Sequence, residues 1–136
     1  MRKKTTISYI YTTNFSIKKR SKKQIKFVIF HYTGMISEKK AIKKLTTTNS
    51  NVSCHYFVKK DGNIIKMLPE LYVAWHAGKS HWKNYKKLNN NSIGVEIQNP
   101  GHKHGYVKFT KKQIKSILKL SKHIIKKFII KKNCIL

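Results

Sequence analysis

The spacing of apolar and polar residues divides the chain into segments that predict a sheet and helices. Residues 25–30 alternate weakly and then become fully apolar, which is typical of a strand buried on both faces. Two β-rich runs, VSCHYFV at 52–58 and NIIKML at 63–68, flank an Asp-Gly hairpin signal, so we expect a pair of strands there. SIGVEIQ at 92–98 predicts a further strand.

The remaining apolar spacing predicts two helices. Ser37 is a good N-cap for a helix that runs through Leu45. Thr110 and Gln113 form a capping box at the start of a second, longer helix. The residues expected on its apolar face are Ile114, Ile117, Leu118, Ser121, Ile125 and Phe128. After this helix, IIKKNCIL predicts the approach to one more strand.

Strands and helices in this mixed order indicate an α/β or α+β fold, in which a mixed central β-sheet is flanked by helices. A chain of 136 residues is long enough for one domain with a buried core. Residues 1–24 are polar and basic and show no strong period. We interpret them as an extended, basic N-terminal arm that precedes a domain formed by residues 25–136.

The lengths of the apolar runs also predict the cellular compartment of the protein. None of them approaches the length of a membrane span. The opening MRKK looks like the start of an export signal, but the TTISYIYTTNFS that follows is too polar for the apolar part of such a signal. We therefore expect a cytoplasmic protein, with the periplasm as the alternative. The two cysteines form no spacing motif, which fits a reducing compartment.

The strong positive charge has two interpretations. Lys and Arg number 31 against four acidic residues, which gives a formal net charge of +27. Such a field attracts polyanions. However, only Arg2 and Arg20 are arginines, whereas lysine, isoleucine and asparagine abound, as expected from an AT-rich genome. Because arginine is the usual reader of bases and phosphates, we favour compositional bias and expect no specific nucleic-acid partner.

The scarcity of acids makes one of them informative. Glu96 lies within the strand SIGVEIQ, flanked by Val95 and Ile97, where a carboxylate loses hydration unless it has partners. Partial burial would raise its pKa into the range that suits general acid–base catalysis. His31 ends the apolar strand at 25–30, and its position alone fits either a packed ring or a metal ligand.

Five segments, in this order and spacing, resemble the zinc-dependent N-acetylmuramoyl-L-alanine amidases of the amidase-2 type, which are related to peptidoglycan-recognition proteins. They are FVIFHYTGM, VSCHYFVKKDGNI, AWHAGKSHW, SIGVEIQNPGHKHGY and the amphipathic helix that follows. The resemblance covers residues 12–136. It implies a hydrolase of peptidoglycan catabolism that cleaves the amide between N-acetylmuramic acid and L-alanine, with peptidoglycan or muropeptides as its partners.

The resemblance also implies roles for individual residues. His31 matches the first zinc-binding histidine of the family. Glu96 matches the glutamate that activates the zinc-bound water and passes its proton on. The loop that lines the substrate groove is matched by Trp75, His76, Ala77 and Gly78. His55 matches a histidine beside the site, for which we expect a structural rather than a ligating role.

The zinc site that the resemblance implies lacks two ligands in this sequence. A zinc ion with three protein ligands lowers the pKa of a bound water and polarises the carbonyl. In the family, the second and third ligands come from a later motif of the form GHSD…P, and the chain reaches Leu136 without it. We therefore expect residues 25–136 to be an incomplete amidase-like domain. It would be the inactive product of a truncated or split gene, or be completed by a separately encoded C-terminal fragment.

Two alternatives stay open at this point. The chain could be a non-catalytic module that binds muropeptides without cleaving them. Other histidines could instead replace the missing zinc ligands, and the candidates are His76, His81, His102 and His104.

Overall fold

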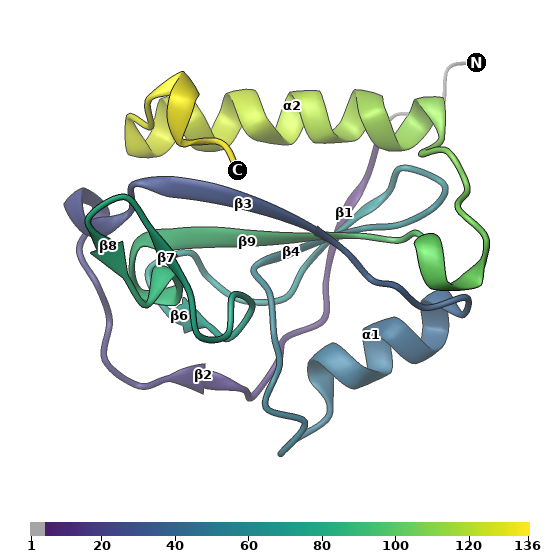
Figure 1. Cartoon of the computed structure of the whole chain (residues 1–136), viewed down its shortest axis with the longest axis horizontal. Helices are drawn as coiled ribbons and strands as arrows, with labels where there is room; N and C mark the ends of the chain where they lie inside the picture. Colours follow the sequence, from purple (N-terminus) through teal and green to yellow (C-terminus); the bar gives the residue numbers. More distant parts are fainter. Residues whose placement is uncertain (1–4) are drawn as a thin grey trace.

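The computed structural model describes residues 5–136 and has a five-stranded mixed sheet at its centre (Figure 1). Across the sheet the strands are β1 (Ile7–Tyr9), β5 (Ile64–Lys66), β4 (Tyr56–Val58), β9 (Ser92–Ile97) and β3 (Phe27–Tyr32). β9 pairs in parallel with β3 and with β4, whereas β4 and β5 form the antiparallel hairpin expected from the Asp-Gly signal. The predicted fold class, a mixed central sheet flanked by helices, is confirmed.

The two long helices cover opposite faces of this sheet, α2 (Lys111–Phe128) above and α1 (Glu38–Thr46) below in Figure 1. Both begin at the predicted caps. The hydroxyl of Ser37 accepts a hydrogen bond from the backbone N–H of Lys40, and Thr110 and Gln113 form the capping box of α2. No helix in residues 5–136 has the length and apolar character that crossing a membrane requires.

The smaller elements surround the sheet. Two short antiparallel ladders are β2 (Phe15–Ser16) with β6 (Val73–Ala74), and β7 (His81–Trp82) with β8 (Tyr85–Lys86). The 3₁₀ turns are η1 (Lys22–Gln24), η2 (Leu88–Asn91), η3 (His102–His104) and η4 (Lys132–Cys134).

Both ends of the described chain pair with the central sheet. Within the stretch interpreted as an arm, β1 pairs in parallel with β5. The division of the chain at residue 24 stays a prediction. At the other end, the backbone N–H of Leu136 donates to the carbonyl of Val28, and the N–H of Phe30 donates to the carbonyl of Leu136. The last residues therefore begin a parallel pairing along β3, in agreement with the predicted approach to a strand.

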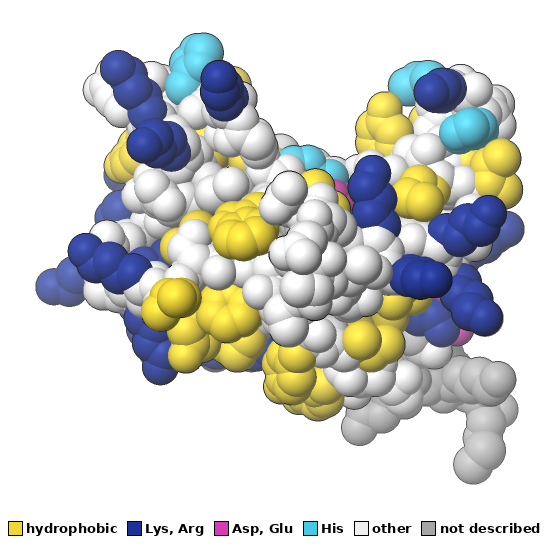
Figure 2. All heavy atoms as spheres, turned by 90° about the horizontal axis from the view of Figure 1, so that it is seen from below, with side chains coloured by type: hydrophobic (Ala, Val, Ile, Leu, Met, Phe, Trp, Pro, Cys, Tyr) yellow, Lys and Arg dark blue, Asp and Glu magenta, His cyan; other side chains and the backbone are white. Residues whose placement is uncertain are grey.

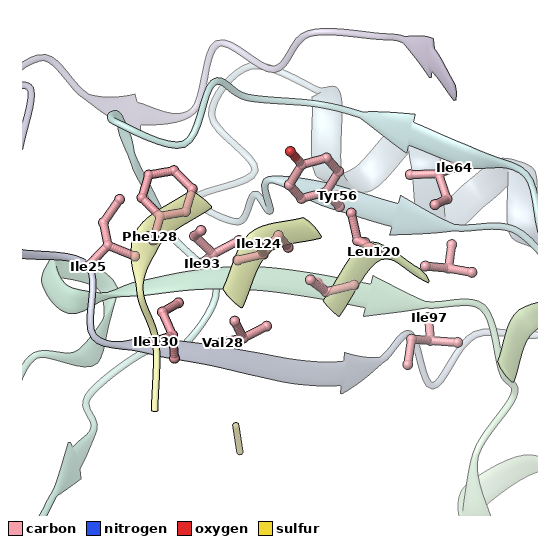
Figure 3. Close-up of a cluster of buried hydrophobic side chains, with 12 residues drawn as sticks. Ile25, Val28, Tyr56, Ile64, Ile93, Ile97, Leu120, Ile124, Phe128 and Ile130 are labelled. Atoms are coloured by element: carbon pink, nitrogen blue, oxygen red, sulfur yellow. The ribbon is translucent and has the colours of Figure 1, made fainter. Parts of the chain in front are cut away.

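The core between α2 and the sheet is apolar (Figure 3), and the predicted face of α2 is right for Phe128, Ile117 and Ile125 but wrong for Ile114 and Leu118. Leu120, Ile124 and Phe128 point into the core, where they meet the inner side chains of β3, β4 and β9. Ile114 and Leu118, by contrast, are 45% and 57% exposed.

Hydrogen bonds from two polar residues explain why α2 is turned away from its predicted orientation. Gln113 and Ser116 are buried, and each satisfies a backbone carbonyl of a neighbouring element. The amide of Gln113 donates to the carbonyl of Gln98 at 2.7 Å, and the hydroxyl of Ser116 donates to the carbonyl of Gly62 at 2.5 Å. Burying a polar group that has such a partner costs little free energy of folding. The face that α2 turns toward the core is therefore determined by these hydrogen bonds as well as by the spacing of apolar residues.

The corrected face can be tested with a matched pair of truncations. Ile124→Ala is expected to lower the free energy of unfolding by about 3 kcal/mol, because it leaves a cavity in the core. Leu118→Ala should cost less than about 1 kcal/mol, since the side chain is mostly solvated. Urea unfolding followed by circular dichroism measures both. A larger loss of stability for Leu118→Ala than for Ile124→Ala would contradict the structure and support the predicted face.

Candidate functional site

The side of the sheet that faces away from α2 brings the two predicted site residues together. His31 on β3 and Glu96 on β9 are register partners in parallel strands, so their side chains leave the sheet on the same face. Ile93, Val95 and Ile97 alternate with Glu96 and enter the core under α2 instead. The alternation that made Glu96 stand out in the sequence thus places its carboxylate opposite the main core.

This face is hollowed into a notch, which Figure 2 shows from below. A histidine and an acidic side chain lie at the bottom of the notch, and the raised parts on either side carry histidine and lysine side chains. Apolar clusters flank the polar strip of the sheet. One packs under α1 and includes Leu45 and Phe57, and the other includes Phe27 and Ile29.

Glu96 has the electrostatic character of a proton-transfer group. Burial raises the pKa of its carboxyl to about 7, while the charge of Lys44 opposes the rise. Residues 5–136 provide neither a hydrogen bond nor an ion pair to this carboxylate. It borders a pocket of about 110 Å³ that is lined by α1 residues such as Ala41 and Leu45. A free carboxyl that titrates near neutral pH can both accept and release a proton during a reaction.

His31 contacts a second histidine from the predicted substrate loop. Its Nε2 lies 2.9 Å from Nδ1 of His76, and Nε2 of His76 lies 3.0 Å from the hydroxyl of Ser92 on β9. Burial lowers the pKa of both rings, and for His76 the neighbouring His55, His31 and Arg20 lower it further. Both imidazoles are therefore neutral at pH 7.

The loop that follows β6 holds His76 against the sheet. The side-chain oxygen of Asn89 accepts hydrogen bonds from the backbone N–H groups of His76 and Ala77, at 3.1 Å and 2.8 Å. The indole of Trp75 donates to Ser16 at 3.1 Å. Gly78 is exposed and has a positive φ of 55°. The four residues predicted to line the substrate groove thus form one loop beside His31, and their contact with substrate stays a prediction.

Gly94 provides the space that the His76 ring occupies. A Cβ atom at position 94 would lie 2.3 Å from Cγ of His76, far inside van der Waals contact. An isolated glycine within a strand commonly marks such a close approach. The sequence therefore carried a signal for this contact, which our interpretation did not use.

His55 has a structural position, as expected. It is fully buried, its Nδ1 accepts from the backbone N–H of Gly94 at 3.0 Å, and its Nε2 lies 2.8 Å from the carbonyl of Tyr72. Burial, reinforced by the charge of Arg20, lowers its pKa to about 3. Since both ring nitrogens have partners, this ring has no lone pair free for a metal ion.

A buried ionic network that sequence reasoning missed supports the same loop. Arg20 donates to the carbonyl of Glu70 at 2.8 Å and to the carbonyl of Asn89 at 2.9 Å. The carboxylate of Glu70 accepts from the hydroxyl of Tyr56 and pairs with Lys66 at 3.2 Å and Lys127 at 3.5 Å. Although burial opposes ionisation, the hydrogen bond from Tyr56 and the contact with Lys66 outweigh it and lower the pKa of Glu70 to about 2. In the sequence, only the rarity of arginine distinguished Arg20 from the other basic residues.

Known proteins with this sequence pattern and fold include several amidases. The Amidase_2 family, described as N-acetylmuramoyl-L-alanine amidase, matches residues 21–135. N-acetylmuramoyl-L-alanine amidase AmiD of Escherichia coli is 33% identical over 120 residues, which take in 79% of this chain and 42% of AmiD. The chain belongs to the Amidase_2 family.

Solved structures of such amidases share the fold. The complex of E. coli AmiD with the substrate anhydro-N-acetylmuramic acid-L-Ala-D-gamma-Glu-L-Lys has a TM-score of 0.76 and 31% identity, over 83% of this chain and 48% of that chain. AMPDH3 of Pseudomonas aeruginosa in complex with anhydromuramic pentapeptide has a TM-score of 0.69 and 26% identity, over 87% and 51% of the two chains. The present chain thus spans about half the length of AmiD and AMPDH3.

The metal that Amidase_2 proteins typically use is zinc, and the residues described here do not form a complete site for it. Three protein ligands and an open position are the usual requirement for a catalytic zinc ion. Residues 5–136 contain no group of three or more His, Cys, Asp or Glu side chains that could hold a metal ion. The proposed substitutes for the missing ligands, His76, His81, His102 and His104, form no such group with His31.

The ionic network of this Amidase_2 chain predicts a specific acid sensitivity. Because the folded-state pKa of Glu70, about 2, lies below its ordinary value of 4.5, the stability it contributes is present above pH 4.5 and is lost as the pH falls toward 2. Glu70→Gln should remove this contribution and cost on the order of 3 kcal/mol at pH 7. Urea unfolding at several pH values measures the effect. Glu38→Gln, at a surface pair, is the control and should keep the parental pH dependence.

The raised pKa of Glu96 predicts the opposite pH dependence. The folded protein holds the Glu96 proton up to about pH 7, whereas the unfolded chain releases it near 4.5, so the parent loses stability as the pH rises between these values. Glu96→Gln should therefore gain stability relative to the parent over this range, with a constant difference above pH 8. Unfolding midpoints of the two proteins give the comparison. A difference that does not change with pH would contradict the raised pKa.

Proposed function

We propose that this chain binds muropeptides in the notch and acts as an N-acetylmuramoyl-L-alanine amidase, hydrolysing the amide between N-acetylmuramic acid and L-alanine. The position of Glu96 is the observation that supports this function most strongly. Its carboxyl titrates near neutral pH beside His31 and borders a pocket, in a family of amidases. AmiD and AMPDH3, which share the fold, have been solved with anhydromuropeptides.

Amide hydrolysis requires a proton to move between two groups. A water molecule attacks the carbonyl carbon, its proton goes to a base, and the C–N bond breaks when the amine nitrogen of L-alanine receives a proton. Glu96 suits both transfers because its pKa of about 7 allows the ionised and protonated forms to coexist at neutral pH. We assign the carboxylate the role of the base toward water and its protonated form the role of the acid toward the leaving amine.

No step is assigned to zinc, because the described residues supply too few ligands. Among the site residues, His31 is the one whose predicted role is to bind the metal, and residues 5–136 contain no group of three metal-binding side chains around it. This observation favours a second candidate function, a muropeptide-binding module that does not cleave its ligand. The two functions share the notch and differ in whether bound muropeptide is hydrolysed.

The two candidates separate in one set of measurements on the full chain. Isothermal titration with anhydro-N-acetylmuramyl tripeptide measures binding, and mass spectrometry of the same mixture with added zinc measures release of the peptide. The amidase function predicts both binding and cleavage. Glu96→Gln should keep the affinity and reduce the rate at least about 100-fold, because general acid–base catalysis contributes about that much. Glu38→Gln serves as the charge-matched control and should retain the parental rate.

Each outcome decides between the candidates. Binding without cleavage at saturating zinc would support the binding module, and the absence of binding by the folded parent would overturn both functions. Intact peptidoglycan sacculi in a parallel assay test the substrate class. We propose muropeptide fragments as the preferred substrate, because the solved complexes of AmiD and AMPDH3 contain anhydromuropeptides.

A further inference from the structure

A chain of hydrogen bonds runs from the site histidine into the sheet. It begins at Nε2 of His31, which lies 2.9 Å from Nδ1 of His76. Nε2 of His76 lies 3.0 Å from the hydroxyl oxygen of Ser92, and that hydroxyl lies 2.6 Å from the carbonyl oxygen of Leu88. Ser92 is completely buried. The number of protons that these groups carry determines the direction of every bond.

The direction follows from the carbonyl at the inner end. A carbonyl oxygen only accepts, so the single hydroxyl proton of Ser92 is donated to Leu88. The Ser92 oxygen can then only accept from His76, which places a proton on Nε2 of that ring. A neutral imidazole carries one proton, so Nδ1 of His76 is an acceptor. The 2.9 Å bond therefore requires His31 to donate from Nε2.

The surroundings of His76 prevent the ring from adopting another arrangement. Asn89 holds the backbone N–H of His76 at 3.1 Å, so the loop is fixed at this residue. The ring lies against the Cα of Gly94, where even a methyl group would overlap it. Both ring nitrogens have partners in this orientation, and turning the ring over would replace both of them with carbon atoms.

We propose that His76 and Ser92 are positioning residues that hold His31 in the tautomer protonated on Nε2. Within residues 5–136, Nδ1 of His31 has no hydrogen-bond partner, so the proposed tautomer leaves a lone pair on this nitrogen free for a ligand. The substrate loop and β9 together thus decide which nitrogen of His31 acts at the site of the proposed function. The tautomer of His31 is inferred from hydrogen-bond geometry, whereas the proposed function is tested by binding and cleavage of muropeptide. Either of the two can therefore fail while the other holds.

Nuclear magnetic resonance of ¹⁵N-labelled histidine tests the tautomer directly, without substrate or metal. Long-range ¹H–¹⁵N correlation of the folded parent at pH 7.5 should show a pyrrole-type Nε2 and a pyridine-type Nδ1 for His31, with the same pattern for His76. Loss of one set of signals in His31→Asn identifies the ring. A pyrrole-type Nδ1 on His31 in the parent would overturn the proposal.

A Ser92→Ala variant tests the inner end of the chain. It removes the oxygen that fixes the proton of His76, so the two His31 tautomers should mix, with their ratio shifting at least about fivefold. Ser92→Thr keeps the hydroxyl and should restore the single tautomer. Ser121→Ala is the matched control. The hydroxyl of Ser121 donates to the carbonyl of Ile117 within α2 at 2.7 Å, on the other side of the sheet from the site, so this variant should change the tautomer of neither ring. An unchanged His31 pattern in folded Ser92→Ala would refute the role of Ser92.

Discussion

Parallel pairing of β3 with β9 is the constraint on which the site depends. The pairing sets His31 beside Glu96 and, on the other face, sets Val28 and Val95 under α2. Because side chains alternate between the two faces, a shift of one residue along β3 would bury the histidine in the apolar core. The same interaction that closes the core thus determines which polar groups meet in the notch, and core packing and site geometry cannot vary independently.

Buried polar groups fix the parts of the site that the sheet does not. Arg20 bonds to the backbone carbonyl of Asn89 in η2, and the side chain of Asn89 accepts from backbone N–H groups of the loop after β6. Such groups are costly to bury unless they are satisfied, and in residues 5–136 no side-chain nitrogen or oxygen that is fully shielded from solvent lacks a partner. Loops held in this way keep their geometry without a large apolar contact. The network therefore places the loop after β6 against β3.

The sequence predicts those features that depend on neighbouring residues. The caps of α1 and α2, the strand that carries His31 and the exceptional position of Glu96 all follow from short stretches of chain. Features that depend on distant partners were missed. The sequence assigned Gln113 to the capping box of α2 but gave no sign of its bond to the carbonyl of Gln98. Ser92 gives no local sign that its hydroxyl connects a histidine to Leu88.

Gly94 sets the distance between the sheet and the loop after β6. A strand normally keeps a neighbouring layer away by the thickness of its side chains, and at this position there is none. The imidazole of His76 fills that space and so comes within reach of both β3 and β9. The absence of a Cβ atom at Gly94 thus allows the loop to pack directly on the backbone of the sheet. Variation at position 94 is therefore limited by the shape of a ring that lies 18 residues earlier in the chain.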